Sequence, residues 1–173
     1  MDLLAARIEP LADHHHKADF SCGIETLDKY LRLQAGQDIR RSIAATFVMI
    51  VEGEPKQILG YYTLSATAID PGELESSVRK RLPPYPLIPA TLIGRLARDR
   101  RFKSCGVGEH LLIDALNRSF HHSKEIASFA VVVDAIDDRA HSWYAKKWGF
   151  IPLQARTDRL YLPMKTIEKL MPK

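Results

Sequence analysis

The first segment of this chain that could do chemistry holds a lysine followed by two glycines, three and five residues later. The run Lys103-Ser104-Cys105-Gly106-Val107-Gly108 follows a predicted strand and opens a predicted helix. Backbone N–H groups at a helix start converge on an anion, and glycines there permit close approach of a ligand. The spacing is neither GxxxxGK[ST] nor GxGxxG, which disfavours nucleoside triphosphates and NAD. The segment therefore indicates either another phosphate site or merely tight helix packing.

Tyr144 is the candidate for proton donation. It lies on a second predicted helix, which Asp137 can cap and which ends at Gly149. A phenol with a pKa of about 10 stays protonated at neutral pH, so it can donate to a developing anion. The alternative is an ordinary amphipathic helix whose tyrosine packs on a sheet.

Basic residues gather in three clusters, although the net charge of the chain is only +4. The segment from Arg95 to Lys103 holds five cationic residues and one aspartate, and Arg40-Arg41 and Arg79-Lys80-Arg81 are the other two clusters. Such clusters suit a polyanion such as the phosphates of coenzyme A or a nucleic acid. A solvated basic face is the alternative for each cluster.

Other reactive side chains lack the partners that chemistry would need. The run His14-His15-His16 has no metal-ligand spacing, so we expect a solvated turn and no metal. Two cysteines, Cys22 and Cys105, are too few for a disulfide framework and show no nucleophile pattern. Asp134, in a predicted central strand, is the one carboxylate considered as a general base, and we expect that the reaction needs no dedicated base.

The elements that must hold these residues alternate between strands and helices. Strands are expected at 3–11, 44–51, 58–66, 91–97, 129–135, 150–153 and 160–164, and helices near 23–31, after 73, from 106, at 137–148 and at 165–170. Ser21 is a reasonable cap for the first helix. The chain is predicted to be a single domain over 1–173, an α+β fold of the three-layer α/β type with helices on both faces of a mixed sheet.

The export and membrane classes are disfavoured. Of 173 residues, 46% are hydrophobic and 27% charged, as in a globular protein, and no apolar run approaches the ~20 residues that span a bilayer. We expect a cytoplasmic protein that does not contact membranes.

Both signature segments resemble those of the GNAT acetyltransferases. The glycine run resembles that family's coenzyme A loop, with Lys103 where Gln or Arg is usual, and 137–150 resembles N-x-x-A-x-x-x-Y-x-x-x-G-F, with Asp137 in place of Asn. The resemblance implies a mixed, mostly antiparallel sheet splayed between its fourth and fifth strands, with acetyl-CoA in the gap. It implies Tyr144 as the catalytic residue and assigns cofactor contacts to Leu96, Ala97, Arg98, Lys103, Ser104, Cys105, Gly106, Val107, Gly108 and Asp137.

The N-terminal half and the segment Leu160 to Lys165 resemble the GNAT toxins of bacterial toxin–antitoxin pairs. That resemblance implies acetylation of the α-amine of aminoacyl-tRNA, which blocks translation. It also implies a ribbon–helix–helix antitoxin, operator DNA bound only through the antitoxin complex, and leaves a homodimer open. The expected tRNA contacts are Arg40, Arg41, Arg79, Lys80, Arg81, Arg95 and Arg100. The alternatives are acetylation of a small amine or a protein N-terminus, and a non-catalytic RNA-binding module.

Overall fold

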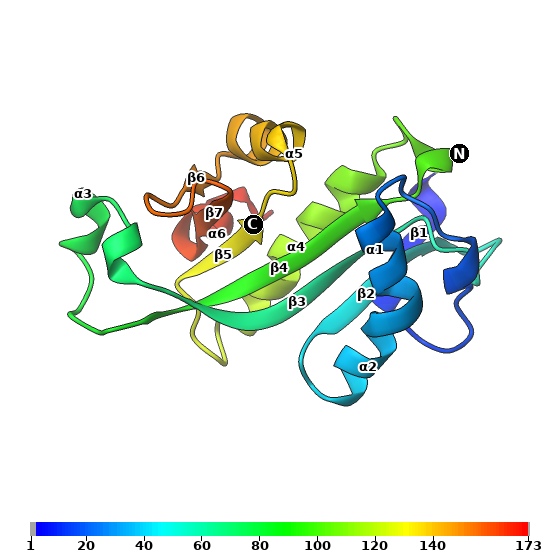
Figure 1. The fold of residues 1–173 in the computed structure, drawn as a ribbon, viewed down its shortest axis with the longest axis horizontal. Coiled ribbons are helices and arrows are strands. Elements are labelled where there is room, and N and C mark those ends of the chain that lie inside the picture. The colour runs from blue at the N-terminus through cyan, green and yellow to red at the C-terminus, as the bar shows by residue number, and fades with distance from the viewer. Residues whose placement is uncertain (1–2, 173) are drawn as a thin grey trace. The chain divides into compact units, whose positions relative to one another are not determined.

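A mixed sheet organises residues 3–172, the part of the chain that the computed structural model describes (Figure 1). Within those residues seven strands follow the order β1-β2-β3-β4-β5-β7-β6. The strands are β1 (Ala6–Pro10), β2 (Ala45–Val51), β3 (Gly60–Ile69), β4 (Ile88–Arg98), β5 (Ala130–Asp134), β6 (Ile151–Pro152) and β7 (Arg159–Pro163). The predicted strands are therefore confirmed, with ends shifted by a few residues.

Helices and helical turns connect the strands. The α-helices are α1 (Glu25–Lys29), α2 (Ala35–Arg40), α3 (Ser76–Arg79), α4 (Val107–His122), α5 (Asp138–Ser142) and α6 (Met164–Leu170). Two π-helical turns, η3 (Tyr30–Gln34) and η6 (Trp143–Lys147), continue α1 and α5. Short 3-10 turns are η1 (Leu3–Ala5), η2 (Lys17–Asp19), η4 (Pro71–Glu73) and η5 (Arg100–Phe102).

The strand pairing is mostly antiparallel, as the resemblance to GNAT acetyltransferases implies. Antiparallel registers join β1 to β2, β2 to β3, β5 to β7 and β6 to β7. The parallel register of β4 with β5 pairs Ala90–Ile93 with Ala130–Val133, which is only the first part of β4. The predicted hairpin between β2 and β3 is confirmed.

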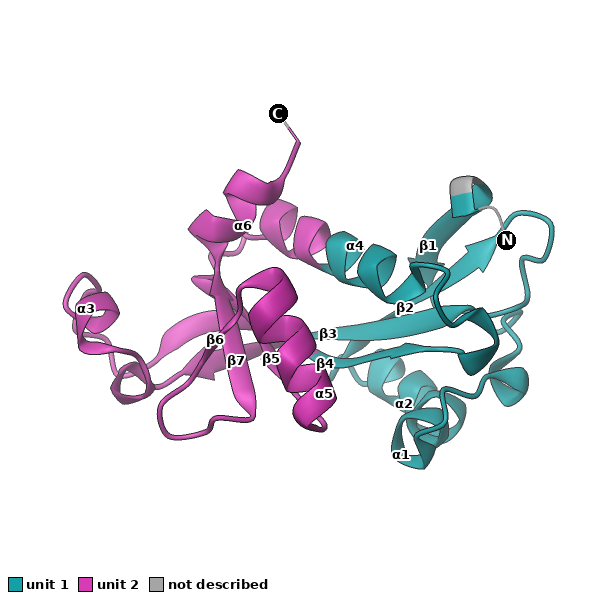
Figure 2. Ribbon diagram, turned by 90° about the horizontal axis from the view of Figure 1, so that it is seen from above, with its two compact units in different colours: residues 1–65, 94–115 teal, residues 66–93, 116–173 magenta. Residues whose placement is uncertain are grey.

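The chain divides into two compact units (Figure 2). Unit 1 contains residues 1–65 and 94–115, and unit 2 contains residues 66–93 and 116–173. In unit 1, α1 and α2 lie on one face of the strands and α4 lies on the other. Its core includes Phe20, Tyr30, Leu31, Ile50 and Tyr61. The core of unit 2 includes Ile69, Ile88, Val132, Leu153 and Tyr161.

The expected capping role of Ser21 is wrong. The helix α1 begins at Glu25 after Ile24, and no side chain caps it. The left-handed Gly23, at φ +88°, turns the chain between Ser21 and the helix. The Ser21 hydroxyl instead donates to Asp28 within α1, at 3.3 Å.

No helix of the described residues is long and apolar enough to cross a membrane.

Candidate functional site

The glycine loop has the backbone geometry of an anion site in unit 1. Ser104 and Gly106 are left-handed, at φ 62° and 81°, and the 16-residue helix α4 begins directly after them at Val107. Within residues 3–172, the N–H groups of Gly106, Val107 and Gly108 donate no hydrogen bond. Three free donors at the positive end of a long helix dipole suit a phosphate. The predicted role of the loop is therefore consistent with its geometry.

The start of α4 is fixed by close packing on β3. A Cβ atom at Gly60 would lie 2.7 Å from Leu111 Cδ1, 2.8 Å from the Ala97 carbonyl oxygen and 3.0 Å from Val107 Cγ1. Only a glycine lets strand and helix approach so closely, and the first turn of α4 gains its position from that contact. Gly60 was missed by sequence reasoning, since nothing local distinguishes it from a turn glycine.

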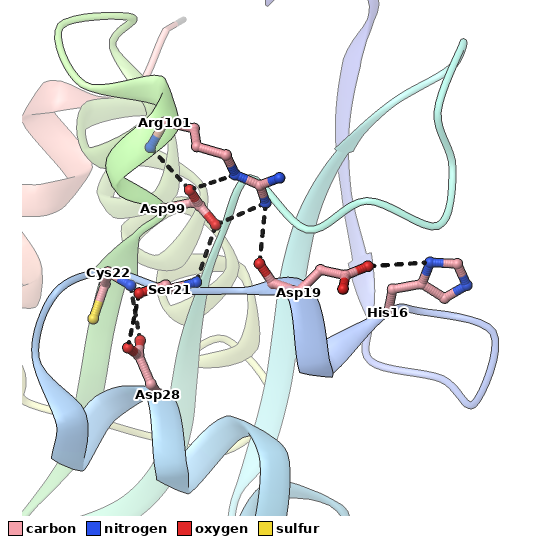
Figure 3. Close-up of polar contacts among 7 residues, drawn as sticks. All are labelled: His16, Asp19, Ser21, Cys22, Asp28, Asp99 and Arg101. Carbon is pink, nitrogen blue, oxygen red and sulfur yellow. Dashed lines mark hydrogen bonds and ion pairs between the residues drawn. The ribbon is translucent and has the colours of Figure 1, made fainter.

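A buried carboxylate anchors the chain just before the loop (Figure 3). Asp99 is fully buried and accepts the backbone N–H groups of Ser21, at 3.1 Å, and Arg101, at 2.9 Å. The Arg101 guanidinium reaches both carboxylate oxygens, at 3.0 and 2.9 Å. Burial alone would raise the pKa of Asp99, but the hydrogen bonds from Arg101 and Ser21 outweigh it and lower that pKa.

This network has two consequences for the loop. It ties the turn η5 to the segment that precedes α1, and Asp28 of α1 in turn accepts the N–H of Cys22 in that segment, at 2.8 Å. It also pairs Arg101 with Asp99, so the guanidinium of Arg101 serves first to hold this turn. Asp99 was not singled out from the sequence. An aspartate at this position can nevertheless cap a turn, because its carboxylate accepts the backbone N–H two residues later.

The end of β4, which precedes the loop, carries the predicted cofactor contacts Leu96, Ala97 and Arg98. Ala97 is buried in the core of unit 1, while Leu96 and Arg98 are half-buried. The Nε atom of Arg98 is buried and has no hydrogen-bond partner among residues 3–172. A buried donor without a partner is costly, so this N–H is available to a ligand. Lys103 and Ser104 are exposed at the rim, and Cys105 is half-buried.

Tyr144 lies in unit 2, within the π-helical turn η6. Its side chain is buried and packs edge-on against Trp143 and Phe150, with ring centroids 5.1 and 5.4 Å away. Burial raises the pKa of its hydroxyl above the ordinary value, so the phenol stays protonated. That hydroxyl has no hydrogen-bond partner in the described part of the chain. A π-helical turn often marks a functional position.

Local signals position that tyrosine as the sequence predicted. The Asp137 carboxylate accepts the Ala140 N–H at 2.8 Å, which confirms it as the cap of α5. Left-handed Gly149, at φ 77°, ends the helix, and the Phe150 N–H donates to the Tyr144 carbonyl at 3.1 Å. Because its carboxylate is used in capping, any contact from Asp137 to a cofactor is an additional role that stays a prediction.

The predicted tRNA contacts differ in exposure. Arg40, Arg41 and Arg100 are exposed in unit 1, and Arg79, Lys80 and Arg81 are exposed on and just after α3 in unit 2. Arg95 is half-buried, and its guanidinium carbon lies 3.5 Å from the Tyr30 ring centroid. Burial and the hydrogen bond to Asp38 raise the pKa of Tyr30 to about 12. Arg95 therefore has a cation–π partner, and its contact with RNA stays a prediction.

The histidine run differs from its prediction as a solvated turn, because His15 is buried. His15 Nδ1 accepts the Ala12 N–H at 2.9 Å, and Nε2 lies 2.8 Å from Glu9 Oε1. His14 and His15 with Glu9 form a group of potential metal ligands. However, the Ala12 N–H requires an unprotonated Nδ1, so Nε2 carries the proton and has no lone pair for a metal.

In unit 2, the Arg159 guanidinium donates to both carboxylate oxygens of Asp134, at 2.7 and 3.0 Å.

No protein-family model matches the chain, but individual relatives do. The sequence is 32% identical over 135 residues to a tRNA-acetylating toxin of Mycobacterium tuberculosis, covering 78% of each chain. It is 29% identical over 172 residues to the probable toxin TacT of Sinorhizobium fredii, covering 95% of this chain and 94% of the relative.

Solved structures agree along nearly the whole chain. AtaT complexed with acetyl-methionyl-tRNAfMet gives a TM-score of 0.88 at 32% identity and covers 95% of this chain and 98% of AtaT. A tyrosine-to-phenylalanine variant of KacT gives a TM-score of 0.90 at 28% identity and covers 96% and 99%. With the glycine loop, the buried tyrosine and the mixed sheet in place, the chain belongs to the family of GNAT acetyltransferase toxins.

Proposed function

We propose that this protein transfers the acetyl group of acetyl-CoA to the α-amine of an aminoacyl-tRNA and thereby blocks translation. The observation that carries the proposal is the match to AtaT, which was solved with acetyl-methionyl-tRNAfMet and which this chain covers to 98% of its length. A related AtaT complex contains acetyl-CoA. Such an acceptor places the reaction in the cytoplasm, where tRNA is charged.

The residues at hand fit acetyl-CoA. The free N–H groups of Gly106, Val107 and Gly108 would hold its pyrophosphate, with Lys103 at the rim. The edge of β4 at 96–98 would lie along the pantetheine arm, and the unpartnered Nε–H of Arg98 offers one further donor. When bound, acetyl-CoA supplies an activated acyl group as a thioester.

Tyr144 would protonate the leaving sulfur of coenzyme A. The acceptor nitrogen would form a bond to the acetyl carbon while the C–S bond breaks, and the Tyr144 hydroxyl would donate its proton to the departing sulfur. The new amide nitrogen would give up one proton to water, and the Tyr144 oxygen would regain one from water. An α-amine with a pKa of about 8 loses its surplus proton to water readily, so no dedicated base is required. Asp134 is paired with Arg159, which argues against it as that base.

An antitoxin completes the proposal. AtaT has been solved with the C-terminus of its antitoxin AtaR, and AtaT–AtaR and KacTA complexes have been solved on DNA. We infer that this chain is neutralised by a small antitoxin of the ribbon–helix–helix class, and that it meets operator DNA only in that complex.

The direct test uses purified protein, radiolabelled acetyl-CoA and a pool of charged tRNA. Label should precipitate with RNA and should be released as N-acetyl amino acid when the aminoacyl ester is hydrolysed. Uncharged tRNA is the control and should take up no label. If label reaches only small amines or protein N-termini, the tRNA proposal fails and a general acetyltransferase takes its place.

A further inference from the structure

The connector between α3 and β4 presents an aromatic side chain to solvent. Tyr85 is 65% exposed, more than any other large hydrophobic or aromatic residue of the described chain except Ile126, which equals it. In unit 2, α3 and this connector project from the rest of the unit in both views (Figure 1, Figure 2). A tyrosine so exposed on a projecting segment adds little to the core and leaves much of its ring open to a ligand.

The backbone holds Tyr85 in a restricted conformation. Pro83 and Pro84 precede it and Pro86 follows it, so the φ angles of these prolines are fixed and extended geometry is favoured at Tyr85 itself. The Tyr85 N–H also donates to the Pro83 carbonyl at 2.8 Å. A ring presented on such a segment loses little conformational entropy when a ligand stacks on it.

Three cations stand close by in the sequence. Arg79, Lys80 and Arg81 are exposed, and none forms an ion pair in the described part of the chain. Hydrogen bonds from the N–H groups of Arg81 and Leu82 to Val78 and Arg79 hold them in a compact turn. Three residues lie between Arg81 and Tyr85, so their Cα atoms are at most about 14 Å apart.

We propose that Tyr85 is a stacking platform for an unpaired base of the single-stranded 3′ end of the acceptor tRNA, with Arg79, Lys80 and Arg81 on the adjoining phosphates. Single-stranded RNA is bound by aromatic rings that stack on bases beside cations that follow the backbone, and this connector offers both. The inference rests on the proposed function, because it assigns this surface to the same acceptor.

Steady-state kinetics with charged tRNA test the assignment. Tyr85→Ala should lower kcat/KM for charged tRNA about 5- to 150-fold, the equivalent of one stacked base, through KM for tRNA and not for acetyl-CoA. Tyr85→Phe keeps the ring and should behave as the parent does. Ile126→Ala is the matched control, since Ile126 is equally exposed in unit 2, and it should change nothing.

Direct binding separates this inference from the acetylation itself. Fluorescence anisotropy of a labelled single-stranded RNA ending in ACCA should show weaker binding to Tyr85→Ala than to the parent, with the same salt dependence. Arg79→Ala with Arg81→Ala should instead flatten the salt dependence by about one unit of slope per lost contact. This binding measurement needs no turnover, so it tests the stacking assignment even if the acetylation assay contradicts the proposed function.

Three results would overturn the stacking assignment. The first is Tyr85→Ala with unchanged tRNA kinetics and RNA binding, and the second is Tyr85→Phe as weak as Tyr85→Ala. The third is a Tyr85→Ala defect confined to antitoxin neutralisation or to sedimentation behaviour, which would assign the connector to a protein partner. Equal melting temperatures of parent and variants are the accompanying check on folding.

Discussion

Tyr144 combines burial with an unused hydroxyl, and the combination matters for its chemistry. Trp143 and Phe150 enclose the ring, while no described residue hydrogen-bonds the hydroxyl. With no partner among the described residues, this hydroxyl is free to donate to a ligand atom. The raised pKa of that hydroxyl makes it a weaker acid but keeps it protonated throughout the neutral range.

Replacing Tyr144 by phenylalanine should therefore remove the proton donor and keep the packing. We expect kcat to fall by about 10²–10⁴-fold, the range of general acid–base assistance, with little change in KM for acetyl-CoA. The measurement is single-turnover acetylation of charged tRNA by folded variant protein. Tyr161→Phe, which removes a different buried hydroxyl in unit 2, is the control. Equal rates for parent and Tyr144→Phe would make Tyr144 a core residue only.

At the scale of elements, the loop depends on how α4 meets β3. A methyl group at Gly60 would collide with a backbone carbonyl and with two side chains of α4, and a carbonyl in a strand cannot move aside cheaply. The helix start must therefore shift if Gly60 gains a side chain. That shift would displace the free N–H groups of the loop.

Gly60→Ala is expected to lower the free energy of unfolding by about 1–3 kcal/mol and to weaken acetyl-CoA binding. Urea unfolding and calorimetric titration measure the two effects. Gly53→Ala is the matched control, because a Cβ there meets nothing within 4 Å. Parent-like stability of Gly60→Ala would show that β3 and α4 have room that the structure does not indicate.

The network at Asp99 makes a prediction about acid stability. A carboxyl whose pKa is lowered by folding contributes stability that is complete above its ordinary pKa of about 3.9 and disappears as the pH falls through the lowered value. Asp99→Asn loses this contribution at every pH and leaves Arg101 without its charged partner. We expect Asp99→Asn to be less stable than the parent at pH 7.

The difference between parent and Asp99→Asn should shrink below about pH 4, where the Asp99 carboxyl of the parent's unfolded chain begins to take up its proton. Urea unfolding at several pH values between 3 and 7 measures it. Asp13→Asn, a change of an exposed aspartate of the same unit, should show no such convergence. A constant difference from pH 7 to pH 3 would contradict the ionised network.

Sequence reasoning succeeded where the signal is local and failed where it is distant. The glycines of the loop, the cap at Asp137 and the stop at Gly149 follow from backbone rules over a few residues. By contrast, the Ser21–Asp99 hydrogen bond joins positions 78 residues apart, and the role of Gly60 depends on a helix that packs from elsewhere. The burial of His15 likewise depends on tertiary contacts.

At the scale of the whole molecule, charge is distributed in patches. The net charge of +4 is too small to attract a polyanion by itself, so RNA binding must depend on clusters. Arg40 and Arg41 lie in unit 1, whereas Arg79 and Arg81 lie in unit 2. Each pair is exposed, so each can be altered without disturbing a core.

Acetylation of charged tRNA is expected to depend strongly on salt. Each phosphate contact releases condensed counterions, so the logarithm of kcat/KM should fall linearly with the logarithm of salt concentration, with a slope that grows with the number of contacts. Charge reversal at Arg40 with Arg41, or at Arg79 with Arg81, should raise KM for tRNA and reduce that slope. The affinity for acetyl-CoA should stay nearly unchanged.

The control for this experiment is Lys165→Glu, which reverses an exposed charge on α6 outside the predicted contacts. It should keep the parent's slope, because a charge that touches no phosphate releases no counterion. Acetylation of a small amine ester by the same protein should respond weakly to salt, which separates tRNA docking from effects on the chemistry. If the double variants keep both the parent's KM and its slope, these clusters are solvated faces, and the phosphates are held by other residues.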